Sequence, residues 1–285
     1  RIQKELDKGN VVIVTGFQGV SVDNDITTLG RGGSDTTAVA LAAKLKADIC
    51  EVYSDVGGVY TADPNIVPGA RKLKEISYEE MLEATASGSK VLQLRSVEYA
   101  RRYNVKIHVR SSFSDKSGTL VKEGDESMEK AIISSIAHTS GEAKVTILGV
   151  PDKPGIAASV FGALADSNIN VDMILQNVSE KGFTDISFTV NKDDLKAASL
   201  VMDEVASELK AKGHDVDTKI AKISLIGAGM KSHPGIAATM FKVLAKNDIN
   251  IDMISTSSIK ISCVIREKEV EKALKALHKA FKLNK

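Results

Sequence analysis

"PGIAASVFGALADSNINVDMI" at residues 154–174 recurs as "PGIAATMFKVLAKNDINIDMI" at residues 234–254, with thirteen of the twenty-one positions identical. An apolar, strand-like run precedes each copy, at 144–150 and at 222–228. A predicted pair of strands and an amphipathic helix follow each copy. A period of about 80 residues is too long for a solenoid repeat, so the sequence predicts two tandem small domains.

A further strand-like segment leads into each unit, at 131–139 and at 214–220. The resulting order, ββαββα, is a circular permutation of the βαββαβ order of ferredoxin-like folds. The sequence therefore predicts two α+β units, one at 131–213 and one at 214–285. It leaves open whether each lead-in strand pairs within its own unit or is lent to the other.

The first 120 residues alternate strand-like apolar runs with helical patterns, as in an α/β layer domain. The run "VVIVTGF" (11–17) begins with five consecutive β-branched residues, which is typical of a strand buried on both faces. Residues 113–130 are polar and rich in turn formers, which predicts a linker. The predicted domain is 1–120 and the predicted linker 121–130. The other expected elements are strands at 49–55 and 105–112 and helices at 36–47, 77–88 and 91–104.

Composition excludes several classes of protein. The 38 basic and 37 acidic residues give a net charge of +1, so no excess charge favours nucleic acid or an anionic membrane. We find no apolar run that approaches a membrane span, and residues 1–10 do not look like a signal peptide. Cys50 and Cys263 lie far apart and suggest neither a disulfide framework nor a metal site. We therefore expect a reducing compartment, the cytoplasm.

The stretch "TLGRGGSDTT" (28–37) combines three glycines with an arginine and an aspartate. Glycines let the backbone approach a ligand closely, and "SDTT" supplies N-cap residues directly before a helix. A helix N-terminus with free N–H groups attracts anions, Arg31 adds a bidentate donor, and Asp35 would attract an ammonium group. A site with both signs suits a zwitterion such as an amino acid. A tight turn before a capped helix explains the stretch equally well.

The segment "SDVGGVYTADP" (54–64) follows a predicted strand, at a position where α/β sheets bind ligands. Asp55 could hold a hydroxyl group or a metal ion, and Tyr60 could stack on a base. Lys90 begins a predicted helix and could reach a phosphate. The simpler alternatives are a polar turn, ordinary packing of the tyrosine and a solvated lysine.

Taken together, these segments resemble the aspartokinases of the amino-acid kinase fold. The resemblance rests on "GFQGV", "TTLGRGGSDTTAVALAAKLKAD", "SDVGGVYTADP" and "SGSKVLQLRSVE", in this order. The tandem repeat, with "GVPDKPGIA", "LQNVS" and "GAGMKSHPGIA", resembles the paired ACT regulatory domains of the same enzymes. The resemblance covers the whole chain. It implies part of an amino-acid kinase α/β domain followed by two ferredoxin-like ACT domains.

The resemblance implies transfer of a phosphoryl group from ATP, as its Mg²⁺ complex, to aspartate. This reaction begins lysine, threonine and methionine biosynthesis, and it needs no prosthetic group or resident metal. By motif, Asp35 would orient the substrate as a catalytic residue. The substrate contacts would come from Arg31, Gly32, Gly33 and Ser34. The nucleotide contacts would come from Ser54, Asp55, Tyr60, Lys90 and Val91.

The resemblance implies feedback inhibition through the ACT pair, which would bind lysine, threonine or both as effector; the sequence does not distinguish these possibilities. Proline and glycine before each first helix leave the helix N-terminus open to a carboxylate. The resemblance places the effector between the units and implies a homodimer or larger oligomer. Contacts from the first unit would be Asp152, Lys153, Pro154, Gly155, Ile156, Ala157, Asn170, Val171, Asp172 and Gln176. The facing wall would be Ile236, Ala237, Asn250, Ile251, Ser257 and Ser258, where Ser258 replaces a glutamate common in relatives.

One family motif is missing from this sequence. The lysine–phenylalanine–glycine–glycine segment, whose lysine contacts the transferring phosphate, should precede Arg1, so we expect the chain alone to be inactive. Two alternatives stay open: a non-catalytic regulatory subunit, for which Met128 is a plausible start, and another amino-acid kinase. The kinase loops at 16–91 disfavour the first alternative, and the ACT pair disfavours the second.

Overall fold

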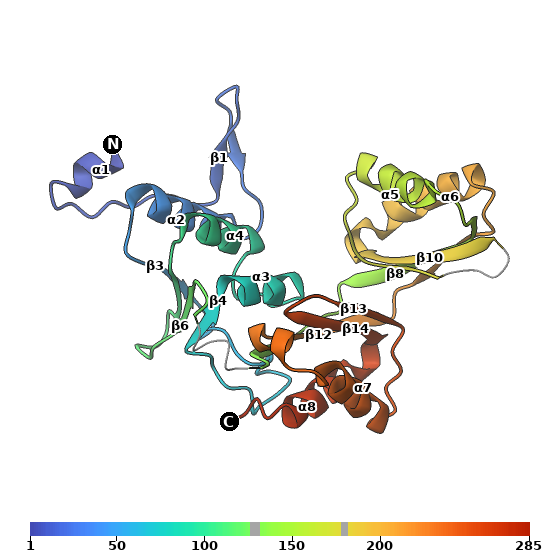
Figure 1. The fold of residues 1–285 in the computed structure, drawn as a ribbon. Helices are drawn as coiled ribbons and strands as arrows, with labels where there is room; N and C mark the ends of the chain where they lie inside the picture. Colours follow the sequence, from blue (N-terminus) through green and yellow to red (C-terminus); the bar gives the residue numbers. More distant parts are fainter. Residues whose placement is uncertain (126–131, 178–181) are drawn as a thin grey trace.

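The computed structural model describes residues 1–125, 132–177 and 182–285. Met128, the start suggested for a regulatory subunit, and the second half of the predicted linker, 126–130, lie outside the described residues. The described residues form three four-stranded sheets and one two-stranded hairpin (Figure 1). One sheet belongs to the predicted kinase part, and one belongs to each repeat unit.

The kinase part is an α/β layer, as predicted. Its sheet has the order β3-β5-β6-β4, in which β3 and β5 are parallel. Side chains from three helices and this sheet share one core, which includes Val39, Met81, Val97 and Ile107. The strands are β3 (Cys50–Ser54), β4 (Glu75–Ser77), β5 (Ile107–Ser111) and β6 (Thr119–Lys122). The helices are α2 (Gly33–Leu45), α3 (Tyr78–Ala86) and α4 (Leu94–Tyr103).

The strand predicted at 11–17 is wrong for this chain. The segment has no regular structure, and Val11 and Ile13 are each 93% exposed. A strand needs a neighbour that pairs with its backbone groups, and within the described residues none lies beside this segment. The chain forms instead a short helix, α1 (Ile2–Leu6), and a hairpin of β1 (Gln18–Val20) and β2 (Ile26–Thr28).

The prediction that 113–130 is a linker is also wrong in part, because β6 lies within it. Thr119 and Val121 are completely buried. The Thr119 hydroxyl donates to the carbonyl of Leu73 at 2.6 Å and accepts from the amide of Val59 at 2.9 Å. Only Thr119 and Val121 of β6 point into the core. Two alternating buried residues are too short a pattern to predict a strand within a polar stretch.

The first repeat unit is a contiguous βαββαβ fold with sheet order β11-β8-β10-β9. Its fourth strand, β11, is the segment predicted to lead into the second unit, and it pairs with β8 instead. The elements are β8 (Glu142–Pro151), α5 (Ile156–Asp166), β9 (Val171–Gln176), β10 (Phe183–Asn191), α6 (Leu195–Glu208) and β11 (Gly213–Asp217).

The second unit has the equivalent order β13-β14-β12-β7. Its edge strand β7 (Ser135–Thr139) precedes the entire first unit in sequence and pairs with β12. The first unit is therefore inserted into the second, and this exchange answers the question that the sequence left open. The remaining elements are β12 (Ile220–Ile226), α7 (Ile236–Lys246), β13 (Met253–Thr256), β14 (Lys260–Arg266) and α8 (Val270–Ala280).

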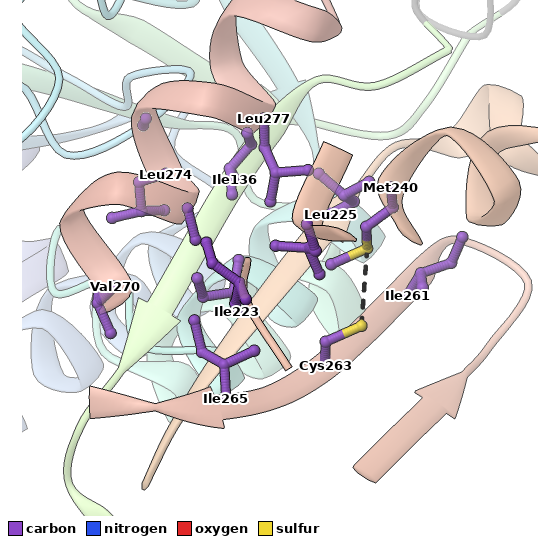
Figure 2. Packing of buried hydrophobic residues seen from close by; sticks show 14 of the residues in the cluster. Ile136, Ile223, Leu225, Met240, Ile261, Cys263, Ile265, Val270, Leu274 and Leu277 are labelled. Atoms are coloured by element: carbon purple, nitrogen blue, oxygen red, sulfur yellow. Dashed lines mark hydrogen bonds between the residues drawn. The ribbon is translucent and has the colours of Figure 1, made fainter. Parts of the chain in front are cut away.

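The core of the second unit gathers side chains from its sheet and both helices (Figure 2). The Cys263 thiol lies 3.9 Å from the Met240 sulfur, and burial raises its pKa to about 12. Ala62 and Val67 of the kinase part belong to the same core. The kinase part and the second unit are therefore joined by shared apolar packing.

A buried polar contact lies at this junction. The Thr61 hydroxyl and His278 Nε2 of α8 are 3.0 Å apart, and both residues are buried. The Thr61 carbonyl also accepts from the amide of Ile136 on β7 at 2.8 Å. Thr61 is thus bonded to two elements of the second unit.

This contact predicts a pH dependence of stability. Burial lowers the pKa of His278 below its usual 6.5, so the folded protein favours neutral imidazole. As pH falls below about 6.5, the unfolded chain binds a proton that the folded chain resists, and stability decreases. We expect the Tm drop between pH 7.5 and pH 5.5 to be smaller in His278→Gln than in the unsubstituted chain. An equal drop in both proteins, followed by differential scanning fluorimetry, would contradict this assignment.

Candidate functional site

The glycine loop turns sharply into α2. Gly30 and Gly32 have φ of +79° and +75°, a left-handed conformation that favours glycine. A Cβ at Gly32 would lie 2.4 Å from Cγ of Gln93, and the Gln93 side-chain amide donates to the carbonyl of Arg31. The loop is therefore held against the start of α4, close to the predicted nucleotide segment at 90–91.

The first turn of α2 carries the predicted substrate residues. Arg31 and Ser34 are exposed, and Arg31 makes no ion pair within the part of the chain that the structure describes. Burial raises the pKa of the Asp35 carboxyl, and a hydrogen bond with the backbone of Gln93 opposes that shift. The structure thus brings Arg31, Ser34 and Asp35 together at one helix end, where an anion is favoured.

Ser54 and Asp55 lie at the carboxyl edge of the parallel strands, where α/β sheets bind ligands. Ser54 is opposite Ser111 of β5, and its hydroxyl donates to Asp55 Oδ1 at 2.9 Å. A Cβ at Gly57 would lie 3.2 Å from the Tyr60 hydroxyl, so this glycine permits close packing of the tyrosine. Ser54 and Asp55 therefore lie at this edge, and Tyr60 packs against the glycine turn that follows them.

Lys90 and Val91 follow α3 in a turn that packs on β7. Gly88 has φ of +111°, and a Cβ there would lie 2.0 Å from the carbonyl oxygen of His138. Burial lowers the pKa of His138, with Asp63 opposing this shift and Lys90 adding to it. Lys90 and Asp63 therefore both lie within electrostatic reach of His138, and Asp63 is in the same loop as Tyr60.

A cavity of about 260 Å³ lies in the second unit, at the N-terminus of α7. Four predicted effector residues line it: Ile236, Ala237, Ser257 and Ser258. The lining residues that sequence reasoning missed are Met230, His233, Gly235, Thr256 and Ile261. The hydroxyl groups and apolar side chains that line the cavity, together with the N-terminus of α7, suit a small amino acid.

The first-unit effector residues do not reach this cavity. Helices α5 and α7 lie at opposite sides of the paired units (Figure 1), and the cavity is lined by second-unit residues alone. Asp172, predicted to contact the effector, instead pairs with Lys222 of β12, and Glu142 Oε1 lies 2.6 Å from the same ammonium group. Asn250 donates to Asp252 at 3.5 Å and does not line the cavity.

These ion pairs cross between the units. Lys144 begins β8's apolar run as Lys222 begins that of β12, and Lys144 lies 3.9 Å from Asp252, the repeat equivalent of Asp172. Each unit thus offers its lysine to the other unit's aspartate. The repeat places a lysine and an aspartate at matching positions in both copies, which could have indicated these ion pairs. The sequence alone does not show that the lysine of one unit contacts the aspartate of the other.

Comparison with known proteins agrees with this architecture. Residues 1–111 match the amino acid kinase family, and residues 144–209 and 223–281 each match an ACT domain. The aspartokinase of Mycolicibacterium smegmatis is 57% identical over 288 residues, covering 99% of this chain and 68% of that protein. The chain belongs to the aspartokinase family. Its recognition by motif, and the predicted kinase-plus-ACT fold, are therefore confirmed.

Solved aspartokinases share the fold. E. coli aspartokinase III in complex with aspartate and ADP (R-state) superposes with a TM-score of 0.83 at 30% identity. The same enzyme in complex with lysine and aspartate (T-state) superposes with a TM-score of 0.75. The matches cover 98% and 99% of this chain but only 62% of each E. coli chain. Among the described residues of this family member, no helix is long and apolar enough to cross a membrane.

Proposed function

We propose that this chain provides the nucleotide edge, part of the aspartate site and the regulatory units of an aspartate kinase. The reaction converts ATP and L-aspartate to ADP and 4-phospho-L-aspartate, which begins lysine, threonine and methionine biosynthesis. The observation that carries the proposal is the loop before α2, which presents Arg31, without an ion pair among the described residues, beside the half-buried Asp35. The aspartate and ADP bound by E. coli aspartokinase III support it.

In this proposal the chain's residues act by positioning and by neutralising charge. Arg31 and Ser34 hold a substrate carboxylate, with the amides of Gly32 and Gly33 as further donors at the N-terminus of α2. Asp35 orients the substrate from the same helix turn. Phosphates and base of Mg·ATP lie along the carboxyl edge of the sheet, within reach of Ser54, Asp55, Tyr60, Lys90 and Val91.

The catalytic proposal is tested with a protein that contains a complete kinase domain. Incubation with Mg·ATP and a panel of amino acids is expected to yield acyl phosphate, trapped by hydroxylamine, from aspartate but not from glutamate. Product from glutamate at an equal rate would instead favour a different amino-acid kinase.

We propose that the ACT units sense lysine, threonine or both, and that the second-unit cavity is one binding site. The lysine bound in the T-state of E. coli aspartokinase III supports this role. The first-unit residues Lys153, Pro154 and Gly155 are exposed, so a second copy of the chain could complete a site over them, as in a homodimer. Two reduced, buried cysteines fit a cytoplasmic location.

The location of the site gives a testable prediction. Ala237 lines the cavity, and Ala157 occupies the same repeat position in the first unit. Titration of the chain with lysine and with threonine is expected to give saturable binding, roughly micromolar to millimolar. Ala237→Leu should weaken it about tenfold or more by filling the cavity, because overpacking a formed site is strongly unfavourable. The matched control, Ala157→Leu, should not; the reverse result would move the site to the first unit.

A further inference from the structure

Helix α3 of the kinase part lies against the sheet of the second unit (Figure 1). Ala84 of α3 is buried in a small apolar cluster with Ala137 of β7 and Ile226 of β12. The residues directly after α3, Ser87–Val91, contain two of the predicted nucleotide contacts. One helix therefore touches the regulatory sheet and ends beside the nucleotide edge.

Glu80, in the first turn of α3, bonds to one wall of the cavity. It is only 2% exposed, and its Oε1 accepts from the backbone amide of Ala228 at 3.0 Å. Its Oε2 accepts from the Ser77 backbone amide at 3.3 Å, and the Glu80 amide donates to the Ser77 hydroxyl oxygen at 3.2 Å, which together form the capping box that starts the helix. Ala228 begins the 3₁₀ segment Ala228–Ser232, which includes Met230 of the cavity lining.

Glu83, nearly one helical turn later, bonds to the opposite wall. Its Oε2 lies 2.8 Å from Lys260 Nζ, and its Oε1 accepts from the Ser257 hydroxyl at 3.5 Å. Ser257 lines the cavity, and its amide donates to the Lys260 carbonyl at 2.8 Å in the turn between β13 and β14. Positions i and i+3 share one helix face, so both walls are joined to the same side of α3.

The C-terminal end of α3 is equally fixed. The amides of Gly88 and Ser89 donate to the carbonyls of Thr85 and Ala84 at 3.1 Å and 2.9 Å. At position 88 only glycine fits, because a Cβ there would lie 2.0 Å from the carbonyl oxygen of His138. We therefore expect a displacement of α3 to move Lys90 as well, because these hydrogen bonds and the close packing of Gly88 hold the turn between them.

We propose that Glu80 and Glu83 are positioning residues that transmit occupancy of the second-unit cavity to the nucleotide segment Ser87–Val91. This inference rests on the proposed effector function. A ligand between the two walls fixes the Ala228 and Ser257 backbones, and the two glutamates pass that restraint to α3. Packed helices move as units, so a restraint on one face reaches the helix end.

Hydrogen–deuterium exchange of the 285-residue chain tests the proposal, with lysine or threonine at saturation as the probe. Effector is expected to slow exchange of the amides at 87–89 about fivefold or more, the lower end of usual allosteric coupling. Glu83→Gln, which removes the charge that pairs with Lys260, should abolish most of this slowing while leaving the effector Kd within about threefold. Lys260→Met should act alike.

The matched control is Glu79→Gln. Glu79 lies on the same helix, but its partner is Arg101 of α4, 4.0 Å away, rather than the second unit. It should retain the full effector response. If effector slows amide exchange at 87–89 equally in the Glu83, Lys260 and Glu79 variants while binding is intact, this inference is overturned but the proposed effector function is not. Absence of any lysine or threonine binding by the unsubstituted chain would overturn the proposed effector function, and this inference with it.

Discussion

Arg31→Ala is expected to reduce kcat/KM for aspartate by about 100-fold to 1,000-fold in a protein with a complete kinase domain. A bidentate guanidinium–carboxylate contact is among the strongest polar interactions, and loss of one well-placed donor has a cost of this order. The Arg31 side chain is exposed and without an ion pair among the described residues. Its loss should therefore leave the Tm unchanged, so the whole effect falls on the reaction.

Two further variants sharpen this prediction. Arg31→Lys retains the charge but not the planar fork, so we expect only partial recovery. Arg101→Ala, on the exposed surface of α4, removes an equal charge far from the loop and should have activity within about twofold of the unsubstituted protein. If Arg31→Ala is as active as Arg101→Ala, the loop is a structural turn and not the aspartate site.

Local patterns in the sequence predicted most of the helices and strands. The paired repeats predicted the strand, helix, strand pair and second helix that both units share. The resemblance to a known family supplied the substrate and nucleotide roles, which periodicity alone does not. The glycines correctly predicted a turn into a helix, but the capping role of "SDTT" was wrong. Helix α2 begins at Gly33 with Gly32 at its N-cap and no side-chain cap, so Ser34 and Asp35 lie in its first turn.

Features that depend on distant partners could not be predicted. The pairing of β7 with β12 instead of with the first unit depends on which sheet edge is open to it, and the residues of β7 alone do not specify that edge. The exposed run 11–17 shows the converse, since an apolar pattern alone does not make a strand. Glu80 and Lys222 were missed because their partners lie 148 and 50 residues away. Charged residues are usually solvated, so nothing local marked these two as buried.

Lys222→Met is expected to destabilise the chain by about 2–4 kcal/mol, which lowers Tm by roughly 5–10 °C. Lys222 is only 2% exposed and Glu142 14% exposed, so the carboxylate cannot regain full hydration when the ammonium is removed. Glu142 Oε2 already has no hydrogen-bond partner among the described residues. An unpaired buried charge is much less favourable than a paired one, although the Lys222–Glu142 pair itself contributes little net stability.

The repeat supplies the matched control for this prediction. Lys144 occupies the equivalent position, but it is 23% exposed and lies 3.9 Å from its aspartate, so Lys144→Met should cost less than about 1 kcal/mol. Adding Glu142→Gln to Lys222→Met should recover a large part of the lost stability, because glutamine is uncharged and no unpaired buried carboxylate remains. Equal loss in the single and double variants, measured by urea denaturation, would show that Lys222 stabilises the junction by packing rather than by its charge.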